Sequence, residues 1–321
     1  MHVLSLAHGV INLEQLSPEY GAERRRLNVR KVRGIRYRGG NHDFVIDRGG
    51  LVVFPRLVAA QHQHEFPTGT LMSGIEGLDE MFGGGLTRGT STLFNGPPGT
   101  GKSTLALRFA VTAAEEGQPV AVYSFDETLG VLHARAASLN FGLERFIQNG
   151  TFRAAQFDPA ELSPGEFAFR VQRDVEEGGV RVVVLDSLNG YLQSIGEERF
   201  LNLQLHELIT FLNQQGVVTM MVVTPQGLLG TMSGPIDVTY LADSVMTFRF
   251  FEAEGAVHKA ISVIKKRTGN HETTIRELKI DADGIEVGEP LREFRGVLSG
   301  VPTLPPKKRR RSPRRQNEKR A

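Results

Sequence analysis

One run of residues has the composition and spacing of a loop that binds nucleotide phosphates. Its nine consecutive residues are Gly96, Pro97, Pro98, Gly99, Thr100, Gly101, Lys102, Ser103 and Thr104. The first eight match the pattern G-x-x-x-x-G-K-[ST], in which glycines let backbone N–H groups wrap closely around an anion. Lys102 would reach the β- and γ-phosphates, and the Ser103 hydroxyl would ligate Mg²⁺. The sequence therefore predicts a site for ATP and Mg²⁺.

Further carboxylates follow predicted strands downstream of this loop. Asp186 ends the apolar run of residues 182–185, and a carboxylate in that position sits beside the bound Mg²⁺ in proteins with such a loop. Asp126 and Glu127 follow another predicted strand, where α/β sheets place their sites. Either acid could polarise the attacking water. An exposed helix N-terminus is the equal alternative, because acids there also interact favourably with the helix dipole.

Two cations near the C-terminus form a third candidate. Lys265 and Arg267 are separated by one residue, so a strand would project both from the same face. Such a pair suits a triphosphate bound by a neighbouring subunit, as an arginine finger does. A solvated basic strand edge is the alternative.

The elements around these residues predict the fold class. Residues 90–94 form a β-rich run before the glycine loop, and residues 102–116 form an apolar-periodic helix after it. From residue 73 to 289 strand-like and helix-like runs alternate, which indicates a mostly parallel sheet flanked by helices. After Val245 the pattern changes to alternating runs with tight turns, so C-terminal antiparallel hairpins should close one edge of the sheet.

The first 60 residues resemble the end of this same domain. Residues 6–10 align with residues 241–245, and Lys31 and Arg33 align with Lys265 and Arg267, at an offset of about 235 residues. We therefore expect residue 1 to fall inside the terminal hairpins of a preceding copy. An unrelated β extension is the alternative, and strands paired into a complete sheet within residues 1–65 alone would overturn the repeat hypothesis.

The composition argues against disulfide bonds, thiolate metal sites and membrane-spanning helices. The chain has 321 residues, no cysteine and a net charge of +2, and it contains no apolar run of membrane-spanning length. We expect a cytoplasmic protein without membrane contact. Residues 305–321 carry nine Lys/Arg and one acid, which leaves 29 basic and 35 acidic residues elsewhere. This disordered basic tail could contact nucleic acid nonspecifically, or be solvated without a specific partner.

The combined motifs resemble the KaiC-like branch of the RecA-type ATPases. Residues 73–79 and 83–86 are similar to the signature that precedes the family's phosphate loop, and residues 125–128 (FDET) are similar to its F-E-E-[ST]. Lys265, Arg267 and His271 match its K-x-R-x-x-x-H segment. The resemblance covers residues 73–290 as one full domain and residues 6–57 as the tail of another.

This resemblance implies a RecA-like fold, ATP hydrolysis and a ring, hexameric in form, with nucleotide between subunits. Glu127 and Asp126 would activate water, and Lys265, Arg267 and His271 would reach the adjacent subunit's nucleotide. It also implies a role in signalling or regulation with an unidentified protein partner. Autokinase members phosphorylate an adjacent Ser and Thr, but those positions hold Thr239 and Tyr240 here, so kinase activity is doubtful.

Two other functions remain open from the residues. A recombination or repair ATPase of the RecA/RadA type would need basic loops for DNA, yet residues 201–247 contain no Lys or Arg. A scaffold that binds ATP without hydrolysing it is the other alternative. The expected organisation comprises a remnant β segment at 1–60, a linker at 61–72, the ATPase domain at 73–300 and a basic tail at 301–321.

Overall fold

A nine-stranded sheet forms the centre of the computed structural model, which describes residues 6–18, 21–193, 198–225, 238–294 and 296–297. The strand order is β15-β14-β13-β12-β7-β11-β10-β8-β9. The strands are β7 (Ser91–Asn95), β8 (Val120–Ser124), β9 (Phe152–Gln156), β10 (Val182–Asp186), β11 (Val218–Val223), β12 (Ser244–Ala253), β13 (Ala256–Lys266), β14 (Arg276–Asp281) and β15 (Gly284–Pro290). Strands from β12 through β9 in this order run parallel, and β13 to β15 add antiparallel hairpins. The predicted fold class is confirmed.

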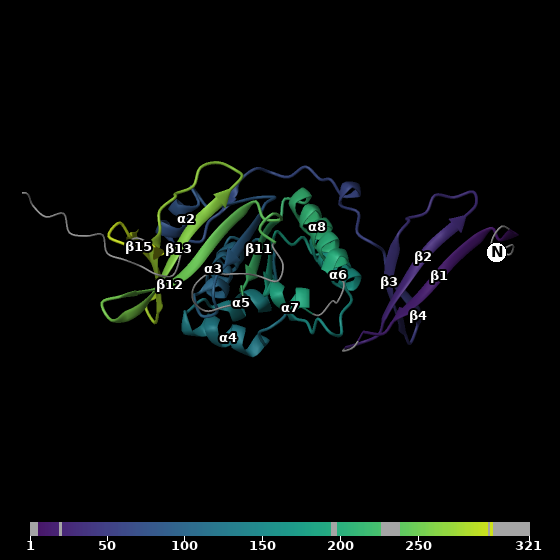
Figure 1. Ribbon diagram of the computed structural model, residues 1–321, viewed down its shortest axis with the longest axis horizontal. Coiled ribbons are helices and arrows are strands. Elements are labelled where there is room, and N and C mark those ends of the chain that lie inside the picture. Colours follow the sequence, from purple (N-terminus) through teal and green to yellow (C-terminus); the bar gives the residue numbers. More distant parts are fainter. Residues whose placement is uncertain (1–5, 19–20, 194–197, 226–237, 295, 298–321) are drawn as a thin grey trace, which may run out of the picture.

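Helices cover both faces of this sheet (Figure 1). They are α2 (Glu76–Met81), α3 (Lys102–Glu115), α4 (Leu129–Ser138), α5 (Leu143–Gln148), α6 (Pro164–Glu176), α7 (Leu188–Gln193) and α8 (Glu198–Gln214). Because side chains alternate along a strand, Val182 and Val184 pack in the core on the α3 side. Val183 and Leu185 pack in the second core, on the side of α6 and α8. This burial on both faces explains the continuous apolar runs of the central strands.

A separate antiparallel sheet precedes the large one. Its strands are β1 (Gly9–Leu16), β2 (Arg24–Val32), β3 (Asn41–Asp47) and β4 (Gly50–Phe54), which pair in chain order and, among the described residues, only with one another. Pairing confined to residues 9–54 is the observation that favours an unrelated extension. The short helix η1 (Ala59–Gln61) and the two-stranded sheet of β5 (Thr70–Leu71) and β6 (Leu86–Thr87) connect it to the ATP-site domain.

The register of this small sheet nevertheless repeats that of β12–β15. Both first pairs contain a bulge at the same place: Val10 pairs with Lys31 and Ile11 with Val29, as Val245 pairs with Lys265 and Met246 with Val263. Both last pairs close through a two-residue turn, since Asp47 faces Gly50 and Asp281 faces Gly284. The two sheets thus share strand order, the bulge of the first pair and the turn of the last, although β14–β15 has a further irregularity between Arg276 and Leu278 that β3–β4 lacks.

The small sheet contacts the large domain through α6. A carboxylate oxygen of Asp43, in β3, accepts a hydrogen bond from the backbone N–H of Gly165 at 2.8 Å. The rings of Phe54 and Phe169 lie 5.7 Å apart. In Figure 1 the purple strands β1–β4 therefore lie beyond α6, at the opposite end of the molecule from β12–β15.

Among the residues described, no helix combines the length and apolar character needed to cross a bilayer.

Candidate functional site

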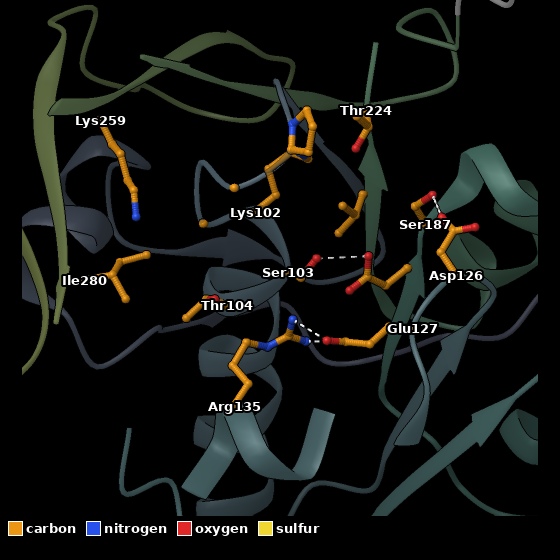
Figure 2. Close-up of a pocket in the computed structure, with 15 residues that line it drawn as sticks. Lys102, Ser103, Thr104, Asp126, Glu127, Arg135, Ser187, Thr224, Lys259 and Ile280 are labelled. Carbon is orange, nitrogen blue, oxygen red and sulfur yellow. Dashed lines mark hydrogen bonds and ion pairs between the residues drawn. The ribbon is translucent and has the colours of Figure 1, made fainter. Parts of the chain in front are cut away.

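A cavity of about 350 Å³ opens at the carboxyl ends of the parallel strands, where α/β sheets bind ligands. Figure 2 shows its lining residues. They include nine of the predicted site residues, namely Pro98, Gly99, Gly101, Lys102, Ser103, Thr104, Asp126, Glu127 and Asp186. These come from three segments far apart in the chain, so the fold brings the predicted phosphate, metal and water-activating groups into one place.

The glycine loop has the backbone conformation its sequence requires. Gly101 has φ of 102° and directly precedes α3, whose N-terminus faces the cavity. This left-handed φ favours glycine, and a Cβ here would also lie 2.5 Å from Cδ1 of Ile280, which would have to move. The Thr100 hydroxyl donates to the Pro97 carbonyl at 2.8 Å and closes the loop.

Lys102 is held inside this loop. Its Nζ donates to the carbonyl oxygens of Gly96 at 2.6 Å and Pro97 at 2.7 Å, and the residue is 5% exposed. Burial lowers the pKa of Lys102 to about 8, although the nearby Asp186 carboxylate partly opposes the shift. The ammonium group is thus poorly solvated, and a phosphate would supply the negative charge that it lacks.

Ser103 and Asp186 meet on the cavity wall. The Ser103 hydroxyl donates to Oδ1 of Asp186 at 3.1 Å. Burial raises the pKa of Asp186, while the hydrogen bond from Ser103 and the charge of Arg135 act in the opposite direction. A hydroxyl and a carboxylate are oxygen ligands of the kind Mg²⁺ prefers, together with water and substrate phosphates. The residues present fit that ion, and no group of three or more His, Cys, Asp or Glu ligands occurs among the described residues.

Asp126 and Glu127 both line the cavity, with Asp126 exposed and Glu127 half-buried, and neither caps the following helix. The Ser187 hydroxyl donates to Asp126, and the Ser124 hydroxyl donates to the backbone carbonyl of Glu127 at 2.6 Å. Thr128 is the residue that caps α4, where its side chain accepts from the N–H of Val131. The Glu127 side chain is 19% exposed and faces Arg135.

The third candidate group lies away from this cavity. Lys265 Nζ donates to the carbonyls of Thr239 and Ala242, and Arg267 pairs with Asp243 at 3.2 Å. Neither these cations nor His271 is among the lining residues. Their action on a neighbouring subunit's nucleotide stays a prediction. The glycine-rich residues 226–234 and the tail at 301–321 lie outside the described residues.

Two cations of the cavity were missed by the sequence reasoning. Arg135 projects from α4 toward Glu127, which precedes the helix, so no helical spacing in the sequence signalled this contact. Lys259 reaches the cavity from β13 (Figure 2). It shares a strand face with the buried Ile261, so a cation on an apolar face was the signal there.

Comparison with known proteins agrees with this geometry. Residues 71–292 match the family model for the KaiC ATPase. The chain is 26% identical over 281 residues to the circadian clock oscillator protein KaiC of Acaryochloris marina, covering 87% of this chain and 53% of that protein. It is 27% identical over 281 residues to the circadian clock protein KaiC3 of a Synechocystis strain, covering 87% of this chain and 55% of the relative. It thus spans about half the length of these curated relatives. The match covers the whole domain that contains the cavity, and the chain belongs to the KaiC ATPase family.

Proposed function

We propose that this chain binds Mg·ATP in the cavity and hydrolyses it to ADP and phosphate. The convergence of Lys102, Ser103, Glu127 and Asp186 on one cavity carries the proposal. Lys102 and the backbone N–H groups of residues 99–104 would bind the phosphates, and Ser103 and Asp186 would hold Mg²⁺, Asp186 through water. The ion would neutralise charge on the transferred phosphoryl group.

Glu127 has the position of a general base. Its carboxylate lies on the cavity wall beside Asp186 and opposite the loop that would bind the phosphates. It would accept the proton of the water that attacks the γ-phosphorus, while the bond to the β-phosphate oxygen breaks. Asp126, fixed by Ser187, would order the same water or its neighbours.

Replacing Glu127→Gln tests this assignment. We expect turnover to fall by roughly 10²–10⁴-fold, because general base catalysis contributes on that order, with ATP still bound. Steady-state phosphate release and direct ATP binding measure the two effects separately. Glu144→Gln is the matched control, since that acid is exposed and outside the cavity. Equal turnover in Glu127→Gln and wild type would leave only an ATP-binding scaffold.

The wider setting follows the relatives. The proteins named above are described as clock proteins, and we propose that this chain acts in signalling or regulation in the cytoplasm as a ring, hexameric in form, with nucleotide between subunits. Lys265, Arg267 and His271 would then serve the adjacent site. A phosphorylation cycle is not part of the proposal, because the two expected hydroxyl positions hold Thr239 and Tyr240.

We also propose that residues 1–60 correspond to the end of a preceding copy of the ATPase domain. The shared register and bulge support this relation. Burial supports it too: Ile11 and Leu13 are each 57% exposed, whereas their counterparts Met246 and Phe248 are fully buried beneath the α3 layer. In addition, β12 pairs with β7, whereas β1 forms an edge within the described sheet. The small sheet therefore exposes the face that β12–β15 bury, which in a preceding copy would pack against the helices of that copy's ATPase domain.

A further inference from the structure

Arg135 forms a two-pronged ion pair with the proposed general base. Its Nη1 donates to Oε1 of Glu127 at 2.9 Å and its Nη2 donates to Oε2 at 2.7 Å. Figure 2 shows the guanidinium and the carboxylate facing each other edge to edge. The side chains are 22% and 19% exposed, so the pair is partly shielded from water. Paired parallel bonds of this kind fix both the position and the orientation of a carboxylate.

This contact bears directly on the chemistry of Glu127. A general base needs an oxygen lone pair directed at the proton it accepts. In the observed arrangement each carboxylate oxygen accepts a bond from Arg135. The guanidinium therefore competes with water for the atoms that Glu127 would use.

Arg135 also has access to the site of the phosphates. It lines the same cavity as Lys102 and Ser103. Its Nε is buried and has no hydrogen-bond partner in the described part of the chain. Guanidinium groups bind phosphate oxygens as well as carboxylates, with the same forked geometry. Arg135 is thus paired with Glu127 and also lines the cavity that would hold the γ-phosphate.

We propose that Arg135 is a positioning residue that exchanges Glu127 for the γ-phosphate of ATP. While its guanidinium holds Glu127, the carboxylate is not free as a base. When the guanidinium turns to the γ-phosphate, Glu127 is released to the attacking water. This inference rests on the proposed function of Glu127, but its test can be separated from that function.

Binding measurements without turnover provide the test. The imido analogue of ATP and ADP differ at the γ-phosphate, so Arg135→Gln should weaken binding of the analogue by about 5–20-fold and change ADP binding less than about twofold. Glu127→Gln should strengthen binding of the analogue by about 3–10-fold, because the competing carboxylate charge is gone. The double variant Glu127→Gln/Arg135→Gln should lose that gain. Calorimetry with Mg²⁺ present measures all three.

Two further variants make the result interpretable. Arg135→Lys keeps the charge but not the fork, and should retain more turnover than Arg135→Gln. Arg170→Gln removes a comparable Arg–Glu pair on α6, outside the cavity, and should change neither affinity. If Arg135→Gln fails to fold, Arg135→Lys and Glu127→Gln still carry the test.

The inference is overturned if Arg135 variants weaken the analogue and ADP equally, or if Glu127→Gln leaves binding of the analogue unchanged. Loss of turnover in Glu127→Gln with that outcome would keep the proposed function and reject only the role of Arg135. Selective loss of analogue binding in Arg135→Gln, with undiminished turnover in Glu127→Gln, would support the phosphate contact and reject Glu127 as base.

Discussion

Lys102 shows how a single residue links ligand binding to stability. Its ammonium group is buried against backbone carbonyls, and within the part of the chain that the structure describes no carboxylate forms a direct ion pair with it. A buried cation is stabilised less in the folded protein than in water, and the lowered pKa of about 8 reports that cost. The buried ammonium group would interact favourably with a bound anion, but its burial lowers the free energy of unfolding.

We predict that stability rises with pH because of Lys102. The pKa of this lysine is about 8 when folded and 10.5 when unfolded. The unfolded chain therefore binds more protons between these values, so the free energy of unfolding increases as pH rises through them. Lys102→Met should remove this rise and stabilise the protein at pH 7 by about 1–3 kcal/mol, while abolishing ATP binding. Denaturant unfolding at pH 7 and 9.5 measures the effect.

Lys279→Met is the control for this prediction, because Lys279 is exposed on β14. It should leave the pH dependence of unfolding unchanged. A rise of the same size in Lys102→Met and wild type would show that other groups cause it.

At the scale of elements, local pattern predicted most of the fold. The strand expected at residues 90–94, the apolar run at 182–185 and the helix expected at 102–116 have strong local patterns, and β7, β10 and α3 lie within a few residues of those bounds. The six-residue helices α5 and α7 were missed, because so few residues show no period.

The site was predictable only in part, for a physical reason. The glycine loop and the acids after strands are local signals, whereas the Arg135–Glu127 pair depends on how α4 packs. Lys259 reaches the loop from a strand more than 150 residues downstream. Likewise, the shared bulge of β1–β2 and β12–β13 can be seen only in the pairing of the strands, which the aligned residues alone do not show.

We predict that coding sequence upstream of residue 1 contains a second phosphate loop. The sheet β1–β4 repeats β12–β15 at an offset of about 235 residues, so the lysine equivalent to Lys102 should lie about 130 residues before residue 1. Reading the genomic frame tests this. A frame without a strand, a G-x-x-x-x-G-K-[ST] loop and a helix in that region would favour an unrelated β extension.

At the scale of the whole molecule, the phosphate loop and the Lys265–Arg267 pair lie on different parts of the surface. Lys102 lines the cavity, whereas Arg267 lies beyond the end of β13 and pairs with Asp243. A head-to-tail ring would place one subunit's pair beside the next subunit's cavity. Each complete site would then need two chains.

Mixing inactive subunits tests this arrangement. Lys102→Ala and Arg267→Ala should each lose turnover alone, because each removes a different half of the site. Exchanged in equal amounts, about one interface in four would combine an intact loop with an intact Arg267. We therefore expect up to about a quarter of wild-type ATP turnover in the mixture, measured after subunit exchange. Turnover no higher than in the separate variants would count against a shared site.

The bulge in β13 lets one strand project Lys259 toward the cavity and Lys265 from the other face. Lys259, Ile261 and Val263 follow the alternation of the strand and face the core that contains the cavity. Ile264 is the extra residue, so Lys265 pairs with Val245, whose side chain packs in the opposite core. In a regular strand Lys259 and Lys265 would share a face, because they are six positions apart. The inserted Ile264 makes them face opposite sides of the sheet. A regular strand with Ile264 paired in the ladder would turn Lys265 to the face of Lys259, so the bulge alone lets one strand present a lysine to each side of the sheet.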